Sequence, residues 1–105
     1  MIIEQTSASF EEALRVSRLL FGNQDRLLVA AAVAEAEAGS IYARNIAEQL
    51  GITDNRVAPQ LASLERAGLL VRLPRVGGER RVYYERVASS FWELCASLTA
   101  EIAAR

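Results

Sequence analysis

The segment from residue 43 to residue 68 constrains the fold more than any other part of this sequence. It holds two short helical patterns separated by Gly51, a residue suited to the left-handed conformation that ends a helix. The apolar positions that recur with helical spacing are Ile46, Ala47 and Leu50 before this glycine, and Val57, Leu61 and Leu64 after it. Thr53 or Asp54 can cap the second helix, which closes at residues 67–68. Two helices joined by so short a turn predict a helix-turn-helix.

Two longer helical patterns precede this unit. Ser7 or Ser9 can cap the first, which ends near Gly22. Its apolar residues fall on one broad face: Phe10, Ala13, Leu14, Leu19 and Leu20. Asn23 or Asp25 can cap the second, an alanine-rich segment from about residue 26 to residue 38 that Gly39 and Ser40 stop. The pair predicts a helical hairpin.

After Gly68 the apolar period becomes two, which indicates strands. Residues 69–73 predict a first strand, residues 74–79 a glycine-containing tip, and residues 81–84 a second strand. Ser89 or Ser90 can then cap a last helix. Its apolar positions, too many for a lone surface helix, are Phe91, Leu94, Cys95, Leu98 and Ile102. We expect this helix to pair with another apolar surface, with Cys95 as a small core residue; a redox role for this thiol is the alternative.

These elements predict a mainly α fold with a small β-hairpin, in the order helix-helix-helix-helix-strand-strand-helix. This is the layout of a winged helix-turn-helix. The sequence shows no repeats, low-complexity tracts or long linkers, so residues 1–105 are expected to form a single domain.

Composition argues against several other classes of protein. The sequence has no histidine and one cysteine, so we expect neither a zinc site within one chain nor histidine-dependent catalysis, and no cofactor. It has no apolar run of the roughly 18 residues that cross a membrane. Residues 1–6 lack the basic and apolar regions of a secretory signal. A cytoplasmic protein that is not an enzyme is the expectation.

The charge is unevenly distributed along the chain. The formal net charge is −1, which is unusual for a nucleic-acid-binding protein. Residues 44–86, however, hold eight arginines against five acidic residues, while residues 1–43 hold three against six. Every basic residue is arginine, which suits bidentate contacts to phosphate or guanine and also fits a GC-rich coding sequence.

Four short motifs occur in this order. They are Gly22-Asn-Gln-Asp-Arg26-Leu27, Ile46-Ala-Glu-Gln-Leu50-Gly51-Ile-Thr, Val57-x-x-x-Leu61-x-x-Leu64-x-x-Ala67-Gly68-Leu69 and Val82-Tyr83-Tyr84. Their order and spacing, over about residues 10–104, resemble the ArsR family of bacterial winged-helix transcriptional regulators. The resemblance implies a dimeric DNA-binding repressor that occludes a promoter. In metal-sensing members a cysteine pair falls where this sequence has Tyr42 and Arg44, so metal sensing is not expected.

The helix-turn-helix context predicts which residues contact DNA. We expect base reading from Asn55, Arg56 and Gln60, and contacts to the DNA backbone from Arg44, Thr53 and Ser63. Arg75, Arg80 and Arg81 flank the hairpin tip and suit a narrow minor groove. Pro59 lies past the first turn of the second helix, where it is expected to kink the helix; the alternative is that a short or partly 3₁₀ first turn accommodates it.

The terminal helices are predicted to form a two-fold homodimer. Its expected interface residues are Phe10, Leu14, Leu19, Phe91, Leu94, Leu98 and Ile102. Symmetry then predicts a palindromic operator on double-stranded DNA, with half-sites about one helical turn apart. Two alternatives stay open: a winged-helix module that binds proteins instead of DNA, and a MarR-type regulator, which typically has longer terminal helices. The residues do not converge on a pocket for a small-molecule effector, although one between the helices is conceivable.

Overall fold

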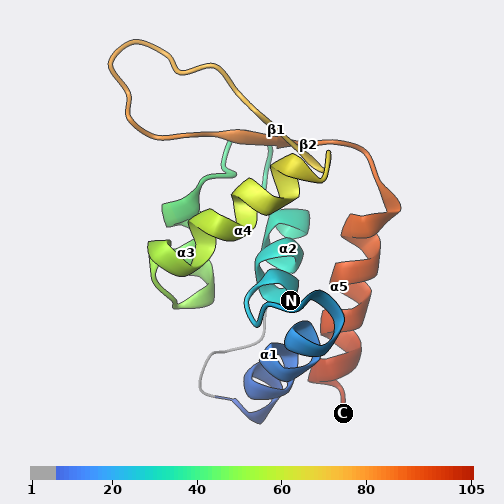
Figure 1. Cartoon of the computed structure of the whole chain (residues 1–105). Helices are drawn as coiled ribbons and strands as arrows, with labels where there is room; N and C mark the ends of the chain where they lie inside the picture. Colours follow the sequence, from blue (N-terminus) through green and yellow to red (C-terminus); the bar gives the residue numbers. More distant parts are fainter. Residues whose placement is uncertain (1–6) are drawn as a thin grey trace.

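The computed structural model describes residues 7–105 (Figure 1). The first six residues, in which no secretory signal was found, lie outside the described residues. The elements are α1 (Ala8–Phe21), α2 (Arg26–Glu35), α3 (Ala43–Leu50), α4 (Asp54–Arg66), β1 (Leu70–Arg72), β2 (Tyr84–Arg86) and α5 (Ser90–Ala103). Their order confirms the predicted mainly α fold with a β-hairpin wing. Within residues 7–105 no helix has the length and apolar content needed to cross a membrane.

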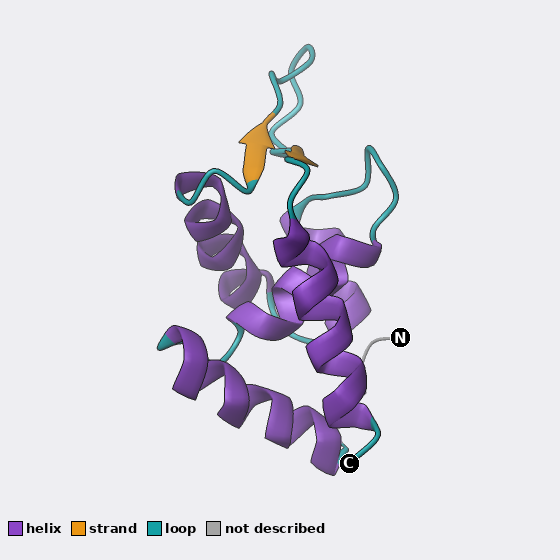
Figure 2. Cartoon of the chain, turned by 90° about the vertical axis from the view of Figure 1, so that its right-hand side faces the viewer, coloured by secondary structure: helices purple, strands orange, loops and turns teal. Residues whose placement is uncertain are grey.

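Helix α2 forms the centre of the molecule, and the other helices pack around it (Figures 1 and 2). All seven residues from Leu27 to Val33 are buried, which means that the helix has no solvent-facing side over two turns. A helix that is apolar on every side is stable only inside a core. Its alanines allow close approach, so α5, α1, α3 and α4 all contact it. Helix α2 ends at Glu35, three residues before the predicted end at Ala38.

Helix α1 begins and ends as predicted, but its buried face is narrower. The Ser7 hydroxyl accepts a hydrogen bond from the Phe10 backbone N–H, and Gly22 ends the helix with φ 73°. The buried residues are Phe10, Ala13, Leu14 and Ser17. Leu19 and Leu20 were predicted to share that face, yet they are 71% and 61% exposed. Leu19 follows the buried Ser17 by two residues, a rotation of about 200° around the helix.

The helix-turn-helix is formed by α3 and α4. Gly51 adopts φ 70°, and the backbone N–H groups of Gly51 and Ile52 bond to carbonyls in the last turn of α3. Thr53 is the N-cap residue of α4, which decides between the two predicted candidates, Thr53 and Asp54. Helix α4 continues through Pro59 to Arg66. Because proline has no N–H, Pro59 cannot donate the helical hydrogen bond to the Asn55 carbonyl.

The wing is an antiparallel pair in which Leu70 faces Arg86, Val71 faces Glu85, and Arg72 faces Tyr84. The second strand lies later than predicted, at residues 84–86 instead of 81–84. The reason is the burial of Tyr84, whose backbone N–H also bonds to the Ile41 carbonyl at 2.9 Å and so attaches the wing to the segment before α3. The loop between the strands is correspondingly longer than the predicted tip.

Helix α5 covers α2 with Trp92, Cys95, Thr99 and Ile102. Cys95 is 1% exposed, as the core interpretation predicted, and burial raises the pKa of its thiol to about 11. A thiol with so high a pKa stays protonated at neutral pH, which disfavours the redox alternative.

Arg86 connects the wing to the end of α2. Its Nη1 donates to the carbonyls of Val33 at 2.6 Å and Ala36 at 2.7 Å. These carbonyls lie at the C-terminal end of α2: the Val33 carbonyl also accepts from the Ala36 N–H at 3.2 Å, and the Ala36 carbonyl lies just beyond the helix.

We expect Arg86→Ala to lower the free energy of unfolding by about 2 kcal/mol, because the partly buried carbonyls of Val33 and Ala36 both lose a charged hydrogen-bond donor. Glu85→Ala, at the exposed neighbour, is the control and should have an effect below about 0.5 kcal/mol. Urea unfolding followed by circular dichroism measures both. Equal stability of the two variants would contradict this role.

Candidate nucleic-acid interface

The side chains of α4 divide into three stripes along the helix. Because successive residues are rotated by about 100°, residues three or four apart share a stripe. The core stripe consists of Val57, Leu61 and Leu64, which are all buried, as the sequence predicted. The two other stripes decide which side chains can meet a nucleic acid.

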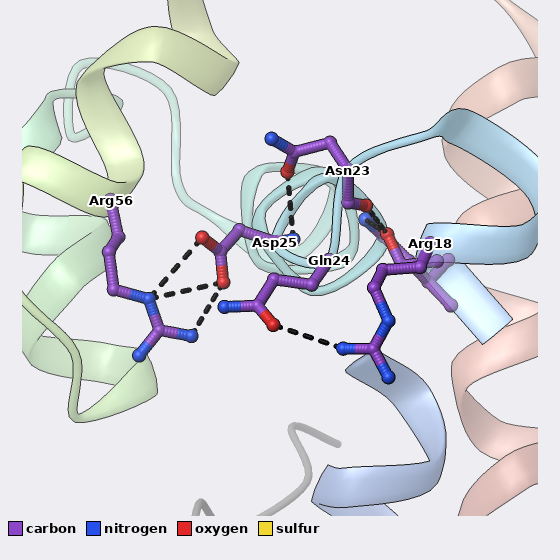
Figure 3. A network of polar contacts seen from close by, with 7 residues as sticks. Arg18, Asn23, Gln24, Asp25 and Arg56 are labelled. Atoms are coloured by element: carbon purple, nitrogen blue, oxygen red, sulfur yellow. Dashed lines mark hydrogen bonds and ion pairs between the residues drawn. The ribbon is translucent and has the colours of Figure 1, made fainter. Parts of the chain in front are cut away.

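The second stripe attaches α4 to the start of α2. Arg56 donates from Nη2 to Asp25 Oδ1 at 2.6 Å and from Nε to both carboxylate oxygens at 3.2 and 3.3 Å (Figure 3). The Asp25 side chain is only 9% exposed. The hydrogen bond to Asp25 raises the pKa of the Arg56 guanidinium, against the opposing effect of burial. This forked pair is a buried contact between two helices that are distant in the sequence.

Arg26 makes the remaining contacts of this stripe. It donates from Nε to Gln60 Oε1 at 3.1 Å and from Nη2 to Ser63 Oγ at 3.2 Å. Gln60 is 3% exposed. We refer to these five residues as the α2–α4 clamp: Asp25, Arg26, Arg56, Gln60 and Ser63.

The clamp corrects the predicted contact face. Arg56 and Gln60 were expected to read bases, and Ser63 was expected to contact the DNA backbone. In the structure all three side chains bond to the start of α2 and face away from the exposed side of α4. The sequence prediction assumed that a polar residue opposite the apolar stripe faces solvent, whereas polar partners at the start of α2 bury Gln60 and leave Arg56 and Ser63 only partly exposed.

The third stripe is the exposed one. Its members, at spacings of three or four, are Asn55, Ala58, Pro59, Ala62 and Arg66. Asn55 keeps its predicted place on the outer surface. Ala62 is half-buried and the other four are exposed. We refer to this stripe as the outer face of α4.

A chain of hydrogen bonds holds the turn that carries Asp25. Ser17 Oγ donates to the Asn23 carbonyl at 2.6 Å and accepts from the Leu27 N–H at 3.0 Å. Asn23 Oδ1 accepts from the Asp25 N–H at 2.8 Å, and Arg18 donates to Gln24 Oε1 (Figure 3). Sequence reasoning considered Asp25 only as a helix cap, although the capping bond is not formed. The signal was present in the Gly22–Leu27 motif, whose acidic residue Asp25 and basic residue Arg26 are two of the five clamp residues.

The predicted backbone-contacting residues at the helix starts are exposed. Arg44 lies in the first turn of α3, and its Nε is 3.7 Å from Asp54 Oδ2. At this distance, with both side chains about half exposed, the pair is a weak one. Thr53 is exposed, and its side chain forms no capping hydrogen bond to α4. Both groups therefore point to solvent beside the outer face.

The predicted wing arginines, Arg75, Arg80 and Arg81, are all exposed. The Arg81 guanidinium carbon lies 4.2 Å from the centre of the Tyr42 ring, and Arg81 also donates to the Tyr83 hydroxyl at 3.4 Å. This hydrogen bond raises the pKa of Arg81. Tyr83 meets Tyr42 edge-to-face at 5.1 Å. Both aromatic rings serve to pack the wing against the start of α3.

An open groove of about 660 Å³ lies between α3, α4 and the wing. Its lining includes Ala58 of the outer face, the cations Arg44, Arg80 and Arg81, and the acids Asp54 and Glu79. The outer face and three predicted DNA-contacting arginines thus border the same concavity. Among residues 7–105, no three acidic or cysteine side chains gather as a metal site, and metal independence stays a prediction.

The predicted dimer residues separate into two groups. Phe10, Leu14 and Ile102 are buried in the core of this chain, so a second copy cannot contact them without unfolding the helices. They were assigned wrongly, because the sequence does not distinguish a core stripe from an interface stripe. Leu94 is 60% exposed, Leu19 is exposed, and Phe91 and Leu98 are half-buried.

Comparisons with known proteins place the fold. No protein-family model and no curated protein matches the chain. Solved structures that do match include the Staphylococcus aureus protein MepR, a transcription regulator of the multidrug efflux pump MepA, and a MepR–DNA complex. The first shares 19% identity, covers 91% of this chain and 71% of MepR, and has a TM-score of 0.63. The second shares 19% identity, covers 90% and 70%, and has a TM-score of 0.68. The chain therefore has the winged helix-turn-helix fold of MepR.

The clamp and the outer face predict opposite results at adjacent positions. Arg56→Ala should lower the free energy of unfolding by about 2 kcal/mol, because it leaves the buried Asp25 carboxylate without its partner. Asn55→Ala, one residue away on the outer face, should change it by less than about 0.5 kcal/mol. Chemical denaturation measures both, and a silent Arg56→Ala would disprove the clamp.

Proposed function

We propose that this chain is a sequence-specific, double-stranded-DNA-binding transcription regulator, acting as a repressor without a metal cofactor. The observation that carries the proposal is the shared concavity: Ala58, on the outer face of α4, lines the same groove as Arg44, Arg80 and Arg81. A helix with the cation Arg44 near its start and an arginine-bearing wing beside it has the arrangement that DNA recognition requires. The fold shared with a MepR–DNA complex supports this reading.

The binding mode follows from the placement of these groups. The outer face of α4 enters the major groove, and Thr53 and Arg44 hold phosphates at the helix starts. Arg75, Arg80 and Arg81 extend the contact into the adjacent minor groove. The net charge of −1 does not oppose this mode, because eight of the twelve arginines lie in residues 44–86. Electrostatic attraction depends on this local excess.

The proposal includes a homodimer formed through the terminal helices. Of the predicted interface residues, we keep only those that are exposed or half-buried in the single chain: Leu19, Phe91, Leu94 and Leu98. Isolated exposed leucines are common, but α1 and α5 together carry three, Leu19, Leu20 and Leu94, and this number favours a partner surface. Two-fold symmetry then gives a palindromic operator with half-sites about 34 to 36 Å apart.

The four sequence motifs support an ArsR-type arrangement within the larger group of winged-helix regulators. MepR is a MarR-family protein, so the likeness to MepR supports the group and not one family within it. The proposed role is binding and not catalysis, in a protein that works in the cytoplasm.

Selection from a random pool of DNA duplexes tests the proposal. The purified protein should enrich a palindrome whose half-sites are about one helical turn apart, because two α4 helices related by symmetry read two grooves. Sequencing of the retained duplexes is the measurement. Absence of any enriched motif at low salt would favour a protein-binding module, and an enriched single half-site would contradict the dimer.

The wing has its own test in the salt dependence of binding. The double variant Arg80→Ala, Arg81→Ala should make the log–log salt slope less steep by about 1.8 per bound protomer, because two phosphate contacts are lost. The sequence preference should stay the same. The control is Arg15→Ala with Arg105→Ala, since both arginines pair with Glu12 of α1 at the end of the molecule opposite the wing (Figure 1). An unchanged slope in the wing variant would exclude this role.

A further inference from the structure

We propose that the outer face of α4 recognises thymine methyl groups, so that each operator half-site is rich in A·T pairs where α4 enters the major groove. This inference rests on the proposed DNA-binding function and names the base chemistry of its target. Ala58, Pro59 and Ala62 would contact the methyl groups, and Asn55 would pair with an adenine. None of these roles requires a movement of the helix.

The composition of the outer face is the first step. Of its five residues, three end in apolar carbon: Ala58, Pro59 and Ala62. The two with hydrogen-bonding side chains, Asn55 and Arg66, lie near the two ends of the helix. Arg66 also donates to Ser63 Oγ at 3.1 Å. The middle of the face therefore presents apolar carbon only.

The clamp prevents α4 from rotating about its axis, so the face that is exposed in the free protein is also the face offered to DNA. Arg56 and Gln60 are the long polar side chains that would reach bases if α4 rotated about its axis. Their bonds to Asp25 and Arg26 hold them on the opposite side, and Gln60 is almost completely buried. Rotation would break these bonds and would also remove Val57 from the core. The apolar face is consequently the one that meets the groove.

The major groove offers one apolar group, the C5-methyl of thymine. G·C pairs present only hydrogen-bonding groups there apart from the ring C–H, and an apolar face would bury them without partners. Short side chains also allow the helix backbone to approach the base edges closely. Asn55 can bond to both N6 and N7 of adenine. An A·T-rich sequence therefore offers thymine methyl groups to the apolar residues of the outer face and adenine to Asn55.

Replacement of thymine by deoxyuridine tests the proposal, because it removes the methyl group and keeps every hydrogen bond. Each thymine of the selected half-site is replaced in turn, and the dissociation constant is measured by fluorescence anisotropy. We expect a loss of about fourfold in affinity for each contacted methyl, the value of one buried carbon group. Thymines in the flanking DNA, replaced in the same way, should have no effect.

A matched pair of protein variants assigns the contact to α4. In Ala58→Gly the penalty for deoxyuridine at the contacted thymine should disappear, since the methyl group on the protein is absent. Ala8→Gly, the same change at an exposed alanine of α1, should keep the full penalty. Thermal unfolding of both variants confirms that each is folded at the temperature of the binding assay.

The outcomes separate this inference from the proposed function. Absence of any selected motif overturns both. A selected motif whose half-sites contain no A·T pairs, or one in which every deoxyuridine binds like thymine, keeps the DNA-binding function and overturns the methyl reading. A penalty that persists in each of the variants Ala58→Gly, Pro59→Gly and Ala62→Gly places the contact elsewhere and overturns the assignment to the outer face.

Discussion

The ion pair between Asp25 and Arg56 is the interaction on which the arrangement of the proposed DNA-facing surface depends. It joins the start of the central helix α2 to the first turn of α4, with the carboxylate almost out of solvent. Breaking a buried pair costs more than its formation contributes, so its value lies in excluding other rotations of α4. The bonds from Arg26 to Gln60 and Ser63 act in the same direction. Core packing sets where α4 lies, and the clamp sets which of its polar stripes faces inward.

The wing is positioned by a second set of contacts, independent of the clamp. The backbone bond from Tyr84 to Ile41 and the two bonds from Arg86 to the end of α2 hold the base of the hairpin. Arg81 and Tyr83 then pack the loop on Tyr42 at the start of α3. Helix α3 is joined to α4 by the short Gly51 turn. The wing and α4, which form the two sides of the groove, are therefore both held in place by contacts to the α3–α4 pair.

Local signals in the sequence predicted the elements well, because caps and periodicity act within a few residues. Ser7, Gly22, Gly51 and Thr53 bound their helices as expected. The assignment of faces was less successful where the decision depends on distant residues. Gln60 looks like a solvent-facing residue until Arg26, 34 positions earlier, is placed beside it. The same limitation placed Phe10 and Ile102 in an interface, because an apolar stripe does not say whether its own chain or a partner covers it.

The two sides of the groove differ in charge: the wing and the start of α3 carry arginines, whereas the outer face of α4 is mostly apolar. Under the proposed function, arginines on the wing and at the start of α3 supply attraction to phosphate, which carries no sequence information. The outer face of α4 has few charges, and it can therefore discriminate between bases by apolar contact and by the single amide of Asn55. A chain with a net charge of −1 can bind DNA under this arrangement, because attraction is local and selectivity does not require cations on α4. Under the proposed function, the exposed arginines of the wing and of α3 affect affinity, whereas the small residues of α4 determine specificity.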